Sequence, residues 1–330
     1  MIAPLLEVRG LGVQYGLGGG WLGPGTRRLQ ALQDVDLVVP EGRSVGIVGE
    51  SGCGKSTLAR AILGLAKPSA GDIRWRGWTV DSADRARMRD MRRGLQVVFQ
   101  DPFGSLDPRM TAGDSVREAL DALEDTGVEA ECRRRVEAAL VEVGLDAGFA
   151  SRYPHELSGG QCQRVAIARA TVVRPRLLIC DEAVSALDVS VQAQIVNLLH
   201  DLSRRHGMAL LFISHNLAVV RHLCEDVVVL YLGRVVERAT RDALFTSPRH
   251  PYTRALLAAV PEPDPRLASR VVAATVTEEV TRTPPGAGGC AFAPRCAHAI
   301  DRCHGERPPL EVAGAEHLVA CHRWRESASA

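Results

Sequence analysis

The chain has 330 residues, of which 46% are hydrophobic and 24% charged, so it can bury an ordinary globular core. Its 40 Lys and Arg residues balance 39 Asp and Glu residues, and the net charge of +1 excludes a global basic field for nucleic acid or anionic lipid. No apolar run reaches the ~20 residues that span a bilayer, and residues 1–10 lack the pattern of a secretory leader. We therefore expect a cytosolic chain of about two domains.

Short apolar runs alternate with helical patterns as far as residue 258. Amphipathic spacing predicts a helix over 55–65 and two charged helices within 111–143. Such alternation is typical of an α/β fold with a mainly parallel, covered sheet, into which a helical segment at about 101–172 is inserted. The apolar runs predicted as buried strands are 45–49, 95–99, 177–181, 209–214 and 226–230.

Around residue 259 the composition changes, and Pro and Gly become frequent. We predict one α/β domain over 1–258 and a linker with an irregular tail over 259–330. The nine cysteines form two groups, and five are expected to be small buried hydrophobic residues in a reducing compartment. These five are Cys53, Cys132, Cys162, Cys180 and Cys224, whereas Cys290, Cys296, Cys303 and Cys321 cluster in the tail.

A glycine-rich loop follows the predicted strand 45–49 and precedes the predicted helix 55–65. Its glycines allow successive backbone N–H groups to surround phosphate oxygens, and the helix N-terminus favours an anion. Lys55 is expected to bridge the β- and γ-phosphates of ATP, and Ser56 to give its hydroxyl oxygen to Mg²⁺. The sequence therefore predicts a nucleotide-binding loop. Its residues are Gly49, Glu50, Ser51, Gly52, Cys53, Gly54, Lys55 and Ser56, followed by Thr57.

Two acids end the apolar run 177–181. Asp181 is placed to join the Mg²⁺ shell, and Glu182 to orient or deprotonate the attacking water. Without the glycine-rich loop, two solvated acids would be the default interpretation. With it, the pattern predicts a P-loop nucleotide hydrolase.

A third motif precedes those acids. Leu157-Ser-Gly-Gly-Gln161 opens a helical pattern, and it resembles the signature of ABC-type ATPases in order and spacing. The resemblance implies a P-loop fold with an antiparallel β subdomain and a helical insertion. It also implies that the signature faces the nucleotide held by a second ATPase chain, so that two ATP molecules are sandwiched between two chains. The signature residues assigned to this second anion site are Ser158, Gly159, Gly160 and Gln161.

The same resemblance assigns further positions. Gln100 corresponds to a glutamine that contacts Mg²⁺ and water and senses the permease. Asp188 ends a loop that crosses the dimer interface, and His215 corresponds to a histidine that contacts the γ-phosphate. Tyr15 is the candidate for stacking on adenine, with a core tyrosine as the alternative. Ala183 departs from the family, in which proline usually follows the two acids, but no catalytic group is removed.

Three stretches resemble the ATPase subunits of dipeptide and oligopeptide importers: 99–110, 245–257 and 289–322. This branch implies docking on two membrane permease chains at the cytoplasmic face of the membrane. It also implies pairing with a related ATPase chain, an indirect link to a substrate-binding protein, and no nucleic-acid partner. Importers of nickel and glutathione share these features, so the cargo stays open. The competing hypothesis is a soluble ABC ATPase that acts on nucleic acid or ribosomes.

The four tail cysteines are separated by five, six and seventeen residues, without the close Cys pair of most zinc sites. Relatives in this branch are thought to hold a [4Fe–4S] cluster in such a tail, and four thiolates suit one. Zinc and free thiols remain alternatives. We predict that Cys290, Cys296, Cys303 and Cys321 converge on one structural metal centre.

Overall fold

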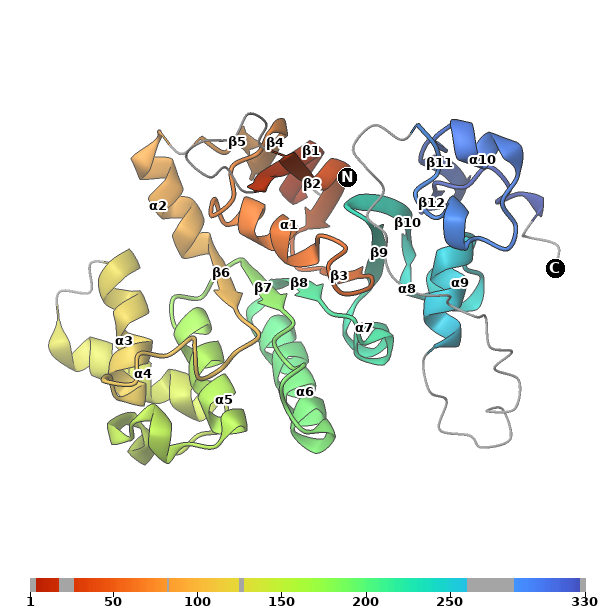
Figure 1. The fold of residues 1–330 in the computed structure, drawn as a ribbon. Helices are drawn as coiled ribbons and strands as arrows, with labels where there is room; N and C mark the ends of the chain where they lie inside the picture. The colour runs from red at the N-terminus through yellow and green to blue at the C-terminus, as the bar shows by residue number, and fades with distance from the viewer. Residues whose placement is uncertain (1–3, 18–26, 82, 125–127, 260–287, 327–330) are drawn as a thin grey trace. The chain divides into compact units, whose positions relative to one another are not determined.

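The computed structural model describes residues 4–17, 27–81, 83–124, 128–259 and 288–326 (Figure 1). Residues 260–287 of the predicted linker lie outside them. The chain divides into two compact units, each built from three segments. Unit 1 comprises Met1–Glu7, Val38–Ser44 and Arg74–Ser214, and unit 2 comprises Val8–Leu37, Val45–Ile73 and His215–Ala330.

Unit 1 contains a run of parallel strands. The middle strand β7 (Leu177–Asp181) pairs in parallel with β6 (Leu95–Val98) and with β8 (Ala209–Ile213). Every residue of β7 and β8 is buried, as expected for apolar strands covered on both faces. The helices of this unit are α2 (Arg85–Gly94), α3 (Ala112–Leu123), α4 (Glu129–Glu142), α5 (Gly159–Thr171) and α6 (Val189–His206), with 3₁₀ turns η1 (Ala147–Ser151) and η2 (Pro154–Glu156).

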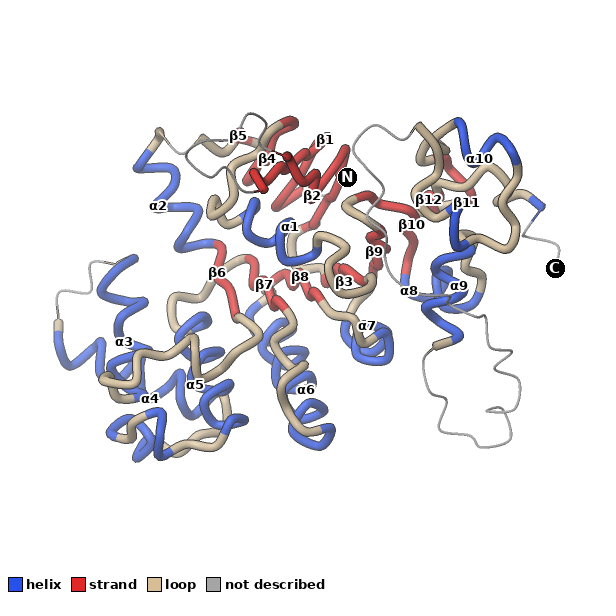
Figure 2. Tube along the Cα trace, viewed as in Figure 1, coloured by secondary structure: helices blue, strands red, loops and turns tan. Residues whose placement is uncertain are grey.

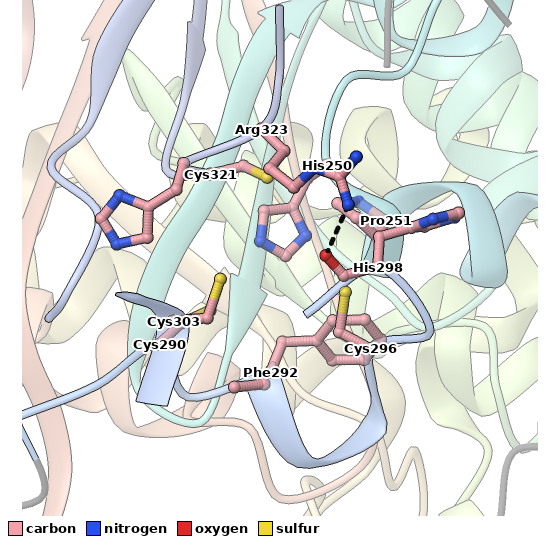
Figure 3. Close-up of a pocket in the computed structure, with 11 residues that line it drawn as sticks. His250, Pro251, Cys290, Phe292, Cys296, His298, Cys303, Cys321 and Arg323 are labelled. Carbon is pink, nitrogen blue, oxygen red and sulfur yellow. Dashed lines mark hydrogen bonds between the residues drawn. The ribbon is translucent and has the colours of Figure 1, made fainter. Parts of the chain in front are cut away.

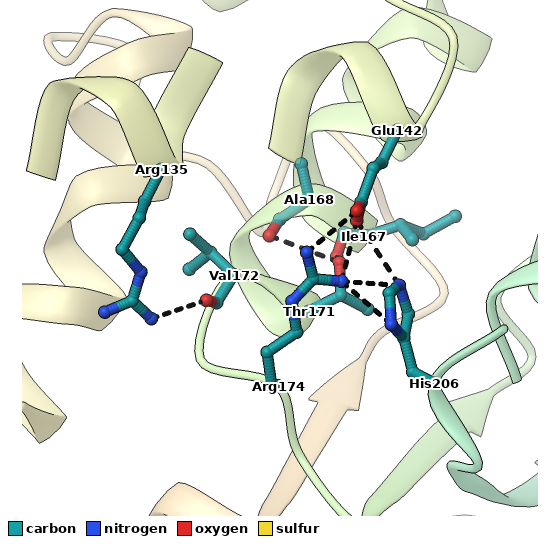
Figure 4. A network of polar contacts seen from close by, with 8 residues as sticks. All are labelled: Arg135, Glu142, Ile167, Ala168, Thr171, Val172, Arg174 and His206. Carbon is teal, nitrogen blue, oxygen red and sulfur yellow. Dashed lines mark hydrogen bonds and ion pairs between the residues drawn. The ribbon is translucent and has the colours of Figure 1, made fainter. Parts of the chain in front are cut away.

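Helices α3, α4 and α5 pack against one another as a group, and the two predicted helices within 111–143 are confirmed as α3 and α4 (Figure 2). A polar network joins the ends of α4 and α6 (Figure 4). Arg174 makes a two-pronged ion pair with Glu142, at 2.9 and 2.8 Å, and contacts His206. Burial and the neighbouring Arg174 lower the pKa of His206. Arg135 of α4 donates to the carbonyl of Val172 at 2.9 Å.

A four-stranded sheet has the order β2-β1-β4-β5. Strands β4 and β5 are antiparallel, with Trp75 opposite Trp78. Long β1 and β2 both supply buried leucines and valines to the core, and the buried and more exposed positions alternate over residues 34–40 of β2. The bounds are β1 (Pro4–Leu17), β2 (Arg27–Pro40), β4 (Ala70–Trp75) and β5 (Trp78–Thr79).

Unit 2 carries the strand order β11-β12-β10-β9-β3. Strands β3 and β9 are parallel, and the other neighbours are antiparallel. The strands are β3 (Ser44–Val48), β9 (Asp226–Tyr231), β10 (Arg234–Thr240), β11 (Glu311–Gly314) and β12 (His317–Val319). The helices are α1 (Lys55–Ile62), α7 (Leu217–Leu223), α8 (Arg241–Thr246), α9 (Pro251–Ala258) and α10 (Asp301–Gly305), with a 3₁₀ turn η4 (Ala293–Arg295).

The cysteine-bearing tail joins the sheet of unit 2. Its strand β12 pairs with β10, placing Val319 opposite Glu237, and the N–H of Ala320 donates to the carbonyl of Val236 at 2.8 Å. A short tail that is rich in Pro and Gly builds little core of its own, and pairing with an existing edge strand supplies the missing order.

The α/β architecture expected from the sequence is therefore confirmed. The five scattered cysteines are all buried, as predicted. Among the described residues, no helix combines the length and apolar character needed to span a bilayer.

Candidate nucleotide-binding site

The phosphate loop, Gly49–Ser56, runs from the end of β3 into α1. All three of its glycines have positive φ, with values of 153° at Gly49, 77° at Gly52 and 111° at Gly54. A Cβ on Gly49 would lie 2.2 Å from the carbonyl oxygen of Leu230, and one on Gly54 would lie 2.8 Å from that of Ala31. Glycine is therefore required at both positions for two reasons, backbone conformation and close packing.

Helix α1 begins at the loop without a capping side chain, because its N-cap residue is Gly54. Its N-terminus therefore directs backbone N–H groups and the positive end of the helix dipole toward the loop. Lys55 is buried, and its ammonium donates to the carbonyls of Gly49 at 2.8 Å and Glu50 at 3.0 Å. These two contacts hold the loop backbone around the Lys55 ammonium, the group that is predicted to bind phosphate oxygens.

Cys53 is a buried member of the loop. Burial raises the pKa of its thiol, so it is held as a neutral thiol. Its carbonyl accepts from the N–H of Gly233 at 2.7 Å, which attaches the loop to the turn between β9 and β10. Cys53 is therefore a packing residue, and the loop chemistry comes from its neighbours.

Two further candidates lie in unit 2. His215 is exposed and directly precedes Asn216, the N-cap of α7, whose side chain accepts from Ala218 and Val219. The cap fixes the backbone next to the histidine. Tyr15 is half-buried near the end of β1, so its ring is not part of the buried core. Both positions are compatible with the roles predicted for them.

The two acids of unit 1 stand where β7 ends. Asp181 is buried as the last strand residue, and Glu182 has a left-handed backbone with φ of 50°. The N–H of Glu182 donates to the carbonyl of Ile213 at 2.9 Å, and Ser185 donates back to the carbonyl of Glu182 through its N–H and hydroxyl. A non-glycine residue in this conformation is uncommon, and such strain concentrates at functional sites.

The signature segment begins helix α5. Ser158 is exposed at the N-cap, and its hydroxyl accepts from the N–H of Gln161 at 3.3 Å. Gln161 returns the contact, because its side-chain oxygen accepts from the N–H of Ser158 at 2.9 Å. This reciprocal capping box presents the N-terminus of a 13-residue helix to its surroundings. A Cβ on Gly160 would lie 2.7 Å from Val191.

Gln100 and Asp188 are also in unit 1. Gln100 is exposed just after β6, and Asp188 is exposed as the N-cap of α6. The structure thus brings Glu182 to the ends of β7 and β8, and it places Gln100 and Asp188 on exposed segments of the same unit. The phosphate loop, Tyr15 and His215 belong to unit 2.

All four tail cysteines line one small cavity of about 20 Å³, which we call the cysteine pocket (Figure 3). The backbone N–H of Cys290 donates to the carbonyl of Cys303 at 2.7 Å. Burial and the neighbouring thiols raise the pKa of Cys290 and raise that of Cys321 to about 11. Cys290, Cys296, Cys303 and Cys321 therefore lie around one cavity.

The sequence also predicted that these four cysteines hold a metal. Within the described ranges, no group of three or more His, Cys, Asp or Glu residues has an arrangement suited to holding a metal ion. The donor set suits a soft metal or a cluster, which would bind these cysteines as thiolates. The cysteine pocket therefore gathers four potential thiolate ligands.

Family models match two parts of the chain. Residues 32–185 match the ABC transporter family, and residues 236–303 match the oligopeptide/dipeptide transporter C-terminal region. A probable peptide ABC transporter ATP-binding protein of Sinorhizobium fredii is 47% identical over 99% of this chain and 92% of its own length. The oligopeptide transport ATP-binding protein OppF of Escherichia coli is 46% identical over 96% of this chain and 95% of its own. This chain belongs to the ABC transporter ATP-binding family.

Solved structures agree with this membership. The dimeric ABC transporter cassette MJ0796 is 30% identical, with a TM-score of 0.63, over 72% of this chain and 98% of that one. CbiO1 of Clostridium perfringens is 29% identical, with a TM-score of 0.63, over 74% of this chain and 92% of that one. The predicted ABC ATPase fold and the ATPase activity of this family member are confirmed.

Two residues that contact the phosphate loop lie in the stretches 245–257 and 289–322, to which the sequence assigned no part in the nucleotide site. Tyr252 of α9 accepts a hydrogen bond from the N–H of Glu50, and Arg295 of the tail forms an ion pair with the Glu50 carboxylate. They lie 202 and 245 residues further along the chain, and no local pattern relates them to the loop.

Proposed function

We propose that this chain is the ATP-hydrolysing motor subunit of a membrane importer for di- or oligopeptides. The observation that carries the proposal is the pairing of two matches in one chain, the ABC transporter region and the oligopeptide/dipeptide C-terminal region. The peptide-transport names of relatives that are 45–47% identical over nearly the whole chain support it. The second region contacts the first through Tyr252 and Arg295, which both bind Glu50.

Unit 2 supplies the residues for nucleotide binding in this proposal. Backbone N–H groups of the phosphate loop cradle the phosphates, and Lys55 bridges their terminal oxygens. When ATP binds, the Lys55 ammonium replaces its hydrogen bonds to loop carbonyls by hydrogen bonds to phosphate oxygens. The loop carbonyls thus hold the ammonium in place before ATP arrives. His215 contacts the γ-phosphate, and Tyr15 stacks on adenine. Ser56 gives its hydroxyl oxygen to Mg²⁺, the hard cation that oxygen donors suit.

Unit 1 supplies the residues for chemistry and for the second chain. Asp181 and Gln100 give further oxygen donors to Mg²⁺, which neutralises charge on the phosphates when bound. Glu182 holds the attacking water and accepts its proton. The capped N-terminus of α5, from Ser158 to Gln161, faces a nucleotide held by another ATPase chain.

The assembly in this proposal has two permease chains, a related ATPase chain at the cytoplasmic face of the membrane, and a substrate-binding protein in indirect contact. The test compares ATP hydrolysis by the purified chain alone and after reconstitution with those partners in liposomes. The rate per chain should rise at least about tenfold, because the sandwich completes each site. A chain that is fully active as a dilute monomer would contradict the proposal, and Lys55→Ala in the assembly sets the background.

We further propose that the cysteine pocket holds a [4Fe–4S] cluster. What supports this is that four cysteines, the usual number of ligands to such a cluster, line the same cavity. Anaerobically purified protein should then be brown and contain about four irons per chain. Stoichiometric zinc without iron would show that the pocket is a structural zinc site instead. Four freely titratable thiols without metal would disprove both.

A further inference from the structure

Arg295 connects the tail of unit 2 to the phosphate loop. Its two terminal nitrogens each donate to one oxygen of Glu50, both at 2.8 Å, in a two-pronged ion pair. The side chains are only 15% and 29% exposed, so the pair is partly removed from water. Two-pronged pairs of arginine and carboxylate are among the stronger and more directional polar contacts in proteins. The second residue of the loop is therefore held by its side chain.

The same residue is held by its backbone. The N–H of Glu50 donates at 2.8 Å to the hydroxyl of Tyr252, whose side chain is almost fully buried. The Tyr252 ring packs against Tyr231 and Phe292, with centroids 4.5 and 5.5 Å away. The Arg295 guanidinium lies over Tyr231 and Phe292, 5.8 and 5.7 Å from their centroids. The rings of Tyr231, Tyr252 and Phe292 thus pack around the two groups that contact Glu50, the Tyr252 hydroxyl and the Arg295 guanidinium.

The segment that carries Arg295 is itself fixed to unit 2. Beside the pairing of β12 with β10, buried Glu237 accepts from the N–H groups of Arg249 and His250, at 2.6 and 3.0 Å. His317 of the tail contacts the same carboxylate at 2.7 Å. Because this anchor is buried, Arg295 is presented to Glu50 from a rigid base.

We propose that Arg295 is a positioning residue for the phosphate loop and that, together with Tyr252, it lets the tail set the affinity for MgATP. Lys55 donates to the carbonyls of Gly49 and Glu50, so the place of Glu50 fixes the path of the loop around the ammonium. Without Arg295, the start of the loop gains conformational freedom. Nucleotide binding then has to order it, and this entropy cost lowers the affinity. The inference rests on the proposed phosphate-binding role of the loop.

The test is a double-mutant cycle on the full chain, with Arg295→Met, Glu50→Gln and the double variant, read as MgATP affinity by calorimetry. Each single variant should weaken binding about tenfold, as expected for a lost charged contact. The double variant should be no weaker than the singles, because both changes remove one interaction. Arg295→Lys should restore part of the affinity, since it keeps the charge without the two-pronged geometry.

The control is Arg302→Met. Arg302 makes an equally two-pronged pair with Glu306, at 2.7 and 2.7 Å, on the exposed side of the tail, and its loss should leave affinity unchanged. Suppose that Arg295→Met and Glu50→Gln bind MgATP within twofold of the wild type, while Lys55→Ala loses binding. The inference would then be overturned, and the phosphate-loop assignment would stand. Losses that simply multiply in the double variant would do the same. If Lys55→Ala also binds normally, the phosphate-loop assignment fails and the inference fails with it.

Discussion

In unit 2, contacts that begin some 200 residues away hold the phosphate loop, whereas in unit 1 near neighbours hold the candidate groups. Glu50 is fixed by Tyr252 and Arg295, while Ser158 is capped by Gln161 three residues on. Glu182 is held by Ser185 within its own turn and by the carbonyl of Ile213 on the adjacent strand β8.

From this difference we expect unit 2 to govern nucleotide binding and unit 1 to govern hydrolysis. Substitutions of Glu182 or Ser158 in unit 1 should change hydrolysis and leave the affinity of the isolated chain for MgATP nearly intact. Substitutions of the proposed Mg²⁺ ligands Asp181 and Gln100 should change both. Substitutions in unit 2, including distant ones in the tail, should change affinity first. The variants below test that separation.

The largest effect is expected from Glu182→Gln in unit 1. An amide cannot accept the proton of the attacking water, so hydrolysis by the assembled transporter should fall roughly 10²- to 10⁴-fold. MgATP affinity of the isolated chain, measured by calorimetry, should stay within a few-fold of the wild type, and ATP-bound dimers should accumulate. Hydrolysis at the wild-type rate would show that Glu182 is not the base.

In unit 2, Gly49→Ala should weaken MgATP binding roughly 100-fold, a size expected of overpacking. The new Cβ would lie 2.2 Å from the carbonyl oxygen of Leu230, so the loop has to move. Gly305→Ala is the matched control, because a Cβ there meets nothing within 4 Å. Normal affinity in Gly49→Ala, by calorimetry on folded protein, would show that the loop path does not govern binding.

A smaller effect is expected from Ser158→Ala in unit 1. Hydrolysis in the assembly should fall about tenfold through loss of a hydroxyl donor, while affinity of the isolated chain is unchanged. Loss of the cap also costs about 1 kcal/mol of stability. Ser158→Thr keeps the hydroxyl and should recover most of the rate. A weaker isolated-chain affinity in Ser158→Ala would contradict the separation of the two units.

The smallest effect on the nucleotide is expected from Cys303→Ser. Iron analysis should show that the bound metal is lost, yet MgATP affinity should fall by no more than Arg295→Met causes, because the tail contacts the loop through Arg295. The thermal midpoint should drop by several degrees as the tail loosens. A loss of affinity as large as that of Lys55→Ala would mean that the cysteine pocket acts on the loop by another route.

Local patterns in the sequence sufficed for much of the site. The strand, glycine-rich loop and helix around Lys55 appear as expected, because left-handed glycines and a helix start depend on residues a few positions apart. The capping box at Ser158 follows from one residue pair three positions apart. The buried strands follow from continuous apolar runs.

Tertiary structure alone decided what holds these local pieces. Nothing near Glu50 in the sequence indicates that Tyr252 and Arg295 contact it, because such pairs depend on how separate elements pack. The same holds for β12, which pairs with β10 because a short tail lacks a core of its own. The clustering of four cysteines in a short tail and the family resemblance predicted that they converge, whereas the geometry of the pocket depends on the packing of Phe292, His250 and the tail backbone. Local conformation is encoded by neighbours, but the arrangement of a site is fixed by burial between distant segments.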